Sequence, residues 1–106
     1  MSSKVLLGYA TFPGEETAQQ ICDVLVREGS IACANLLGPA RSIYKWNGQV
    51  HNETEWIAVL KTSELKKTIL MERFRALHPY ANPCLVFLNI EDGLPAFLQW
   101  AYVQCI

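Results

Sequence analysis

The dipeptide Asn47-Gly48 is the feature that most restricts how this chain can fold. Two-residue hairpin loops favour Asn-Gly, because both central residues of a type I′ turn need positive φ angles. Strand-like sequence flanks the dipeptide, "RSIYKW" before it and "ETEWIAVLKT" (residues 53–62) after it. The dipeptide and its flanks predict a long antiparallel hairpin in which Tyr44 and Trp46 share one face.

Strands and helices are predicted along the rest of the chain from its apolar spacing. Apolar, β-prone runs predict strands, and apolar residues three or four positions apart predict helices. Gly29 marks the end of the first helix, Gly38-Pro39 breaks the second strand, and Ser63 caps the second helix. The predicted strands are residues 5–12, 31–37 resuming at 41–50, 53–62 and 84–90, and the predicted helices are 15–28, 64–78 and 94–103.

The order strand, helix, strand, strand, helix, strand predicts two βαβ units with right-handed crossovers. Such units form a four-stranded antiparallel sheet with both helices on one face, the ferredoxin-like α+β sandwich. The helix at the C-terminus is an addition to that plan. A length of 106 residues fits one domain, residues 1–106.

Charge and composition argue against several classes of function. The net charge is −1 and the nine Lys and Arg residues are scattered, so no basic stripe is available for nucleic acid. No apolar stretch approaches about 18 residues, and residues 1–7 lack the features of a signal peptide, so we expect no contact with membranes. The four cysteines have no Cys-x-x-Cys spacing and are typical of reduced thiols, which predicts a cytoplasmic protein.

Sequence motifs of enzymes are not visible in the chain. The loop "ATFPGEET" after the first strand has neither the two cysteines of a copper chaperone nor the cation that an acylphosphatase needs. The sequence contains no glycine-rich phosphate loop and no Gly-x-Ser-x-Gly elbow. We therefore expect a binding protein and not an enzyme.

The segment "RALHPYANPCLVFLNI" connects a predicted helix to the last strand. Pro79 cannot continue a helix and disfavours helical geometry at His78. His78 is thus expected at a sharp corner near the negative end of the helix, where a histidine either complements the helix dipole or binds a metal. Cys84 begins a strand and is expected to point into packed side chains. We therefore take His78, and not Cys84, as the candidate metal ligand.

Four blocks of the sequence together resemble one known family. They are "ACANLLGPARSIYKWNG", "ETEWIAVLKT", "ALHPYANP" and "FLQW". Their order and spacing resemble the CutA divalent-cation-tolerance family over nearly the whole chain, as far as Trp100. The resemblance implies a ferredoxin-like subunit in a tight homotrimer, similar in assembly to the PII-type signal proteins. It also implies cytosolic handling of divalent metal ions, with copper binding in the family.

The copper ligands of the family are only partly present. The copper-binding bacterial pattern has a cysteine near the end of the first strand and two adjacent histidines before Pro-Tyr. This chain has Ala10 and Leu77 at two of these three positions and keeps only His78. The expected ligand is therefore copper or another divalent cation, weakly bound, and no organic cofactor is expected.

A pocket at the boundary between subunits is the other expected site. The residues expected to form it are Tyr44, Trp46, Glu55, Lys61, Tyr80 and Trp100. In the alternative hypothesis the protein is a trimeric, PII-like ligand-sensing or scaffold module, and its metal binding is incidental. Tyr44, Lys61 and Tyr80 would then recognise an organic or anionic ligand.

Overall fold

Four strands form one antiparallel sheet in the order β2-β3-β1-β4, in a computed structural model that describes residues 4–106. The predicted α+β arrangement is confirmed, and residues 1–3 of the predicted domain lie outside the described part. None of the helices within residues 4–106 is long and apolar enough to cross a membrane. The elements are β1 (Val5–Phe12), α1 (Glu15–Arg27), β2 (Cys33–Trp46), β3 (Gln49–Ser63), the 3-10 helix η1 (Glu64–Lys66), α2 (Lys67–Leu77), β4 (Leu85–Asn89) and α3 (Pro95–Gln104).

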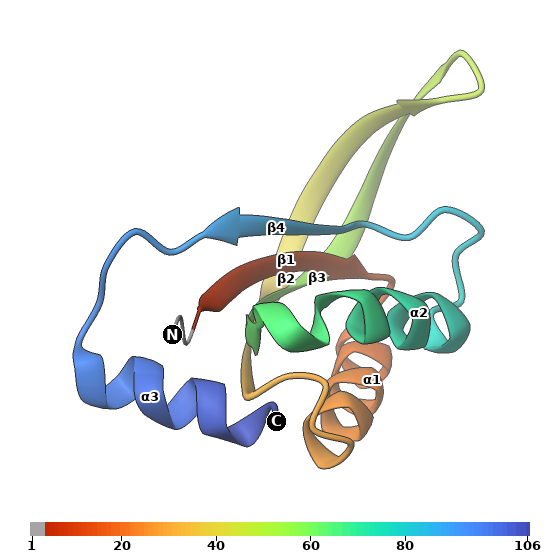
Figure 1. Ribbon diagram of the computed structural model, residues 1–106. Coiled ribbons are helices and arrows are strands. Elements are labelled where there is room, and N and C mark those ends of the chain that lie inside the picture. The colour runs from red at the N-terminus through yellow and green to blue at the C-terminus, as the bar shows by residue number, and fades with distance from the viewer. Residues whose placement is uncertain (1–3) are drawn as a thin grey trace.

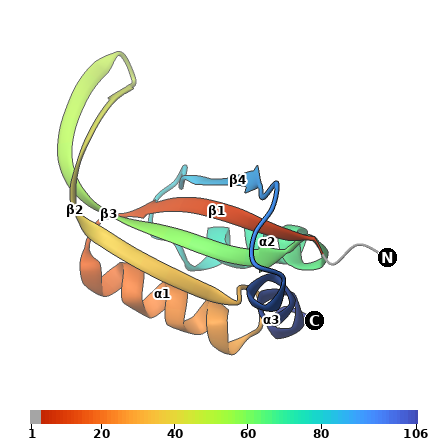
Figure 2. The ribbon, with the colours of Figure 1, turned by 90° about the vertical axis from the view of Figure 1, so that its left-hand side faces the viewer.

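The main core lies between the sheet and two helices. α1 and α2 cover one face of the sheet, and the other face carries no helix (Figures 1 and 2). Alternate residues of β1 and β3 point into this core, because successive side chains of a strand face opposite sides. The buried side chains of the core are Ala10, Phe12, Ala18, Ile21, Cys22, Leu25, Ile31, Ala58, Leu60, Leu70 and Phe74.

The terminal helix α3 packs near the start of β1 and forms a second, smaller core (Figures 1 and 2). Val5 and Ala32 pack there against Ala101 and Cys105. The hydroxyl of Ser63 donates a hydrogen bond to the carbonyl oxygen of Cys105 at 3.1 Å. Ser63 occupies the N-cap position of η1, which leads into α2, but its side chain makes no capping hydrogen bond there.

Two turns occur at the glycine residues that predicted them. α1 ends at Arg27, and Gly29 adopts a φ of 77°, which only glycine accepts easily. Asn47 and Gly48 have φ angles of 52° and 78°, as a type I′ turn requires. This turn pairs Trp46 with Gln49 and so sets the register of the hairpin.

The predicted break of the second strand at Gly38-Pro39 is wrong. β2 continues through this pair, and the register against β3 shifts between Leu37 and Ala40. The shift is a local bulge, which bends a strand without ending it. Beyond it the β2–β3 hairpin curves away from the rest of the molecule as an arm (Figure 2), and the molecule measures 47 × 25 × 22 Å.

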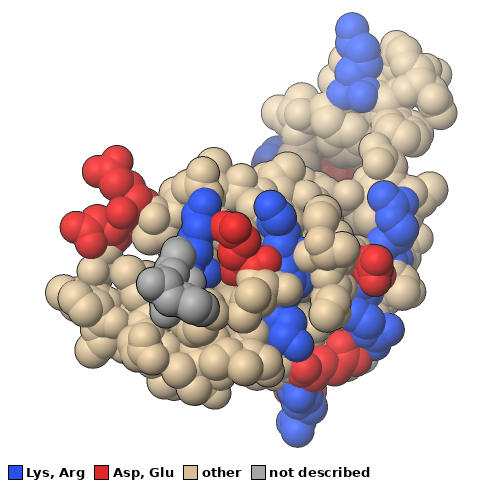
Figure 3. Space-filling model, in the orientation of Figure 1, with Lys and Arg blue, Asp and Glu red and all other residues tan. Residues whose placement is uncertain are grey.

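Charged side chains of both signs are interspersed on the face shown in Figure 3. Because they alternate, this face presents no continuous basic surface. Ion pairs at the exposed surface contribute little to stability. Three such pairs occur within residues 4–106: Lys4 with Glu64 at 3.2 Å, Arg27 with Asp23 at 2.7 Å, and Arg73 with Glu28 at 2.6 Å.

Gly38 leads to a test of the packing at the bulge. A Cβ atom built at this position would lie 2.5 Å from the indole ring of Trp56. We expect Gly38→Ala to lower the free energy of unfolding by about 1–3 kcal/mol, because the added methyl group overpacks the site. Urea titration at one fixed protein concentration measures this loss.

A Trp56→Leu background provides the control for that test. With the indole removed, the same Gly38→Ala change should cost clearly less, as a double-mutant cycle would show. Equal losses in both backgrounds would mean that the indole does not restrict this position.

Candidate functional site

The candidate site is a cavity of about 640 Å³ on the helix-free face of the sheet. Its walls come from β1, from the β2–β3 arm between the bulge and the turn, and from the loop that follows α2. This volume lies within the range of roughly 300–1,000 Å³ that is usual for small-molecule sites. The lining residues are Tyr9, Thr11, Arg41, Ser42, Ile43, Tyr44, Trp46, Glu53, Glu55, Tyr80, Ala81, Asn82 and Cys84.

The register of the sheet explains why two carboxylates face the same cavity. Ser42 pairs with Glu53, and Thr11 pairs with Ile57, which lies two positions after Glu55. Because side chains alternate along a strand, Glu53 and Glu55 point away from the core that Ala58 helps to form. The odd-numbered positions of β3 therefore supply the charged floor of the cavity.

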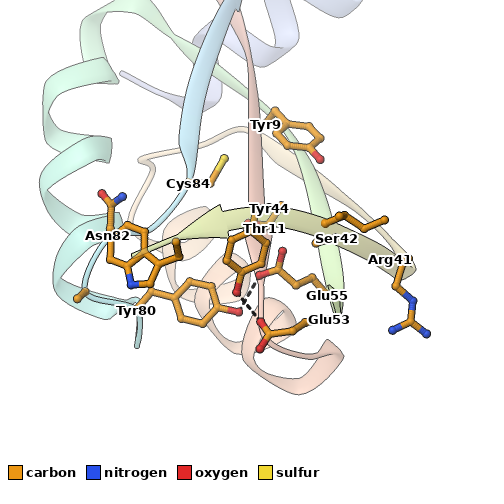
Figure 4. Close-up of a pocket in the computed structure, with 13 residues that line it drawn as sticks. Tyr9, Thr11, Arg41, Ser42, Tyr44, Glu53, Glu55, Tyr80, Asn82 and Cys84 are labelled. Carbon is orange, nitrogen blue, oxygen red and sulfur yellow. Dashed lines mark hydrogen bonds between the residues drawn. The ribbon is translucent and has the colours of Figure 1, made fainter. Parts of the chain in front are cut away.

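Each carboxylate accepts a hydrogen bond from a tyrosine (Figure 4). The Tyr44 hydroxyl donates to Oε1 of Glu53 at 2.5 Å, and the Tyr80 hydroxyl donates to Oε2 of Glu55 at 2.7 Å. Glu55 is only 7% exposed, so its carboxylate lies largely out of water. A buried charge is tolerated when it is hydrogen-bonded, and Tyr80 provides that bond.

The carboxylates in turn keep both tyrosines protonated. Burial, and then the hydrogen bond to Glu55, raise the pKa of Tyr80 above its ordinary value. The hydrogen bond to Glu53, followed by burial, raises the pKa of Tyr44. Near neutral pH both hydroxyl groups therefore remain donors to the carboxylates.

His78 holds the loop that carries Tyr80. Its Nδ1 accepts a hydrogen bond from the backbone N–H of Tyr80 at 3.2 Å, so this nitrogen carries no proton. Its Nε2 is then the protonated nitrogen and donates to the carbonyl oxygen of Thr11 at 2.8 Å. The ring packs against Phe12 and Phe74, with centroids 5.2 and 5.0 Å away, and His78 is only 7% exposed.

A metal does not fit at His78 in this arrangement. Both ring nitrogens are engaged within the chain, and neither is free to coordinate an ion. Ala10 lies in the core and Leu77 packs against it, so neither position supplies a ligand. Within residues 4–106, no three His, Cys, Asp or Glu side chains come together as a metal-binding group. The ligand role of His78 stays a prediction that this geometry does not favour.

The chain brings four of the six expected pocket residues together. Tyr44, Trp46, Glu55 and Tyr80 line the cavity. Whether a second subunit borders this cavity stays a prediction.

Lys61 and Trp100 lie elsewhere. Lys61 shares a face of β3 with Glu55 but is roughly 20 Å further along, at about 3.3 Å per residue. Its ammonium group donates to Oδ1 of Asn35 at 2.7 Å. Trp100 lies on α3 beside Phe97, and it is 44% exposed.

Some lining residues were not found from the sequence. Glu53 could have been found, because it occupies the same face of the strand as Glu55. The sequence gave no such signal for Thr11 and Asn82. They line the cavity only because β1 and the loop after α2, which are distant in the sequence, lie close together in the fold. Cys84 does not point into packed side chains as expected: it is half-buried and lines the cavity, and burial raises the pKa of its thiol.

The pKa of Tyr80 leads to a prediction about alkaline pH. Because the folded state raises this pKa above the ordinary value of about 10, the unfolded chain loses the proton first. The stability that Tyr80 contributes should be fully present below about pH 10 and should fall as the pH rises further. Urea unfolding between pH 8 and 11 measures this fall, with Tyr80→Phe as the control that lacks the titrating group. Identical pH profiles for the two proteins would contradict the prediction.

The two hydrogen bonds of His78 predict one tautomer. The ring should carry its proton on Nε2 and none on Nδ1, and this state should persist when Zn(II) is added. Long-range ¹H–¹⁵N NMR spectra of the histidine rings distinguish the two nitrogens, and His51 serves as the internal comparison. A proton on Nδ1, or the loss of the Nε2 proton upon addition of Zn(II), would show that His78 is available to metals.

Comparisons with known proteins agree with this structure. A family model described as CutA1 divalent ion tolerance protein matches residues 6–104. The divalent-cation tolerance protein CutA of Thermotoga maritima is 40% identical over 96 residues, which cover 91% of this chain and 94% of that protein.

Solved structures of similar proteins superpose over almost the whole chain. The divalent ion tolerance protein CutA1 of Ehrlichia chaffeensis gives a TM-score of 0.92 at 31% identity, covering 99% of both chains. The periplasmic divalent cation tolerance protein CutA of Archaeoglobus fulgidus gives a TM-score of 0.92 at 30% identity, covering 96% of this chain and 99% of that one. From the family match and these relatives, we conclude that the chain belongs to the CutA1 divalent ion tolerance protein family.

Proposed function

We propose that this chain acts in tolerance to divalent cations, as a homotrimer that works by binding and not by catalysis. Membership of the CutA1 family is the observation that supports this role, since its relatives are described as divalent-cation tolerance proteins. The structure adds two kinds of support. One is the exposed arm, and the other is the carboxylate groups of the cavity, which are possible ligands for a cation.

The arm supports the assembly. Ile43 and Val50 lie on one face of the arm and are 66% and 69% exposed, and neighbouring exposed apolar side chains are typical of contact surfaces. Within residues 4–106, β2 and β4 are the outer strands of the sheet, so each has an edge without a strand partner. Contact between the arm of one copy and a different surface of the next copy would be heterologous, and repeated contacts of this kind can close a ring.

The cation is proposed to be copper or another divalent ion, held weakly. A single chain offers no group of three ligands within its described part, so we propose that more than one copy contributes to binding. Glu55 is a carboxylate of the cavity that would serve as a ligand, whereas His78 would first have to give up the hydrogen bond at the nitrogen that coordinates the ion.

The cavity favours a second candidate function, a ligand-sensing module like the PII-type proteins. Its volume and its aromatic lining by Tyr44, Trp46 and Tyr80 suit an organic molecule better than a bare ion. Lys61 does not line the cavity. The hypothesis of an anionic ligand therefore loses the positively charged side chain that was expected to bind it. Under this function, metal binding is incidental.

The compartment stays a prediction. Reduced cysteines favour the cytoplasm, and all four are free thiols in the structure. The related protein of Archaeoglobus fulgidus is described as periplasmic, so family membership alone does not determine the compartment. We propose the cytoplasm for this chain on the basis of its cysteines.

The proposed trimer predicts a mass of roughly three times 11.9 kDa. Val50→Lys should shift the mass towards the monomer, because a charge would then be buried in the contact made by the arm. Gln20→Lys is the control, since it adds the same charge at an exposed polar position of α1, away from the arm. Light scattering after size-exclusion chromatography at micromolar concentration measures the mass. A monomeric parent protein would contradict the proposed assembly.

A growth assay tests the role in cation tolerance. Expression in a strain that lacks its own family member should raise the concentrations of Cu(II) and Zn(II) that the cells tolerate. The Val50→Lys variant should not restore tolerance if the ions bind between copies, whereas Gln20→Lys should. Equal growth with and without the protein, at matched expression, would count against the role in tolerance.

A further inference from the structure

We propose that the cavity binds a small organic cation, a primary ammonium group attached to a short apolar chain. This inference rests on the second proposed function, the ligand-sensing module, and names its ligand class. The ammonium group would lie between Glu53 and Glu55, and the carbon chain would lie against the aromatic walls.

The hydrogen-bonding capacity of the cavity defines the charged end of the ligand. The hydroxyl protons of Tyr44 and Tyr80 are already donated to Glu53 and Glu55. A carboxylate has about four lone-pair positions, so each carboxylate keeps acceptors that the tyrosines do not use. Glu53 and Glu55, which lie close together in Figure 4, thus present acceptors that the N–H groups of a ligand can use. An ammonium group carries three N–H donors and no acceptor.

The charge of the cavity favours the same conclusion. Two carboxylates line it, and Arg41 is the cation among the lining residues. Arg41 is exposed, and its guanidinium group points away from Glu53 and Glu55 (Figure 4). Because Glu55 is largely shielded from water, its attraction for a cation is screened less than at an exposed surface.

Aromatic rings supply the other half of the site. Tyr9, Tyr44, Trp46 and Tyr80 contribute to the walls. The faces of such rings attract cations and also accept apolar carbon groups. A hydrated divalent ion would gain nothing from these surfaces, whereas an alkylammonium ion would bury its chain against them.

The groups that a single chain places in the cavity suit two simpler occupants less well. A metal ion needs several directly coordinating groups, and the described residues provide no cluster of three. A quaternary ammonium ion has no N–H group, so it would bury the acceptors of Glu53 and Glu55 without satisfying them. A primary ammonium ion satisfies both the acceptors and the rings.

A matched series of probes tests the ligand class. Pentylammonium, 1-pentanol and pentanoate share a carbon chain and differ only in the head group. Isothermal titration of the full-length protein should show binding of pentylammonium that is about tenfold or more tighter than that of 1-pentanol, and no binding of pentanoate. Tetramethylammonium should bind more weakly than pentylammonium. ¹H–¹⁵N NMR shifts should locate binding at Tyr44, Glu55 and Tyr80.

Two variants connect binding to the carboxylates. Glu53→Gln should weaken pentylammonium binding by about tenfold, because it removes a charge-assisted hydrogen bond at an exposed position that tolerates change. Glu55→Gln should weaken it similarly, provided that circular dichroism shows a folded protein. Glu72→Gln is the control, since it removes one negative charge from the exposed surface of α2. Equal binding by the parent and both cavity variants would overturn the proposal.

The remaining outcomes separate this inference from the proposals on which it rests. Tighter binding of pentanoate in the cavity would overturn the cationic ligand class and leave the ligand-sensing function standing. If no probe shifts the cavity resonances, both the ligand class and the ligand-sensing function fail. Tolerance to Cu(II) in the growth assay is independent of either result.

Discussion

The alternation of side chains along β3 is the constraint on which both the core and the cavity depend. Ala58 and Leu60 face the helices, while Glu53 and Glu55 face the cavity. A slip of one residue would exchange the two sets, placing carboxylates in the apolar core and leaving the core residues in water. The turn at Asn47-Gly48 aligns the arm from the pair Trp46–Gln49 as far as Ala40–Glu55. Beyond the bulge, the pairing of β3 with β1, in which Ala58 lies opposite Ala10, keeps the core residues facing the helices.

A chain of contacts leads from the apolar core to the charged site. Phe12 and Phe74 pack around the ring of His78, whose nitrogens connect β1 to the loop after α2. The loop then places the Tyr80 hydroxyl on Glu55, which makes a largely buried carboxylate tolerable. His78 therefore belongs to the support of the cavity. Coordination of a metal by His78 would have to break one of these two hydrogen bonds, and its role as a ligand stays a prediction.

Local patterns were sufficient to predict the elements, their order and the faces of the hairpin. The spacing of apolar residues, the residue types of turns and the residues at helix ends all depend on neighbours in the sequence. The contacts that were not predicted join residues that are distant in the sequence. Ser63 lies 42 residues from Cys105, which takes its hydroxyl group, and His78 lies 67 residues from Thr11. The face of Lys61 was predicted correctly, but its distance from the cavity along the strand was not considered. The four cavity residues that were predicted came from the family resemblance and not from geometry.

Under the two proposals, the arm would take part in both assembly and ligand binding. Tyr44, Trp46 and Glu53 of the arm line the cavity, and Val50, which pairs with Lys45 next to Trp46, is exposed. The hairpin is long and projects from the body, so its own chain restrains its base more than its tip (Figure 1). A neighbour that fixes the tip would also fix the strands that carry Tyr44 and Glu53. By linkage, a ligand that prefers the fixed arm must then favour assembly to the same degree. Assembly and occupancy of the cavity are therefore expected to strengthen each other, even where no residue of the neighbour touches the ligand.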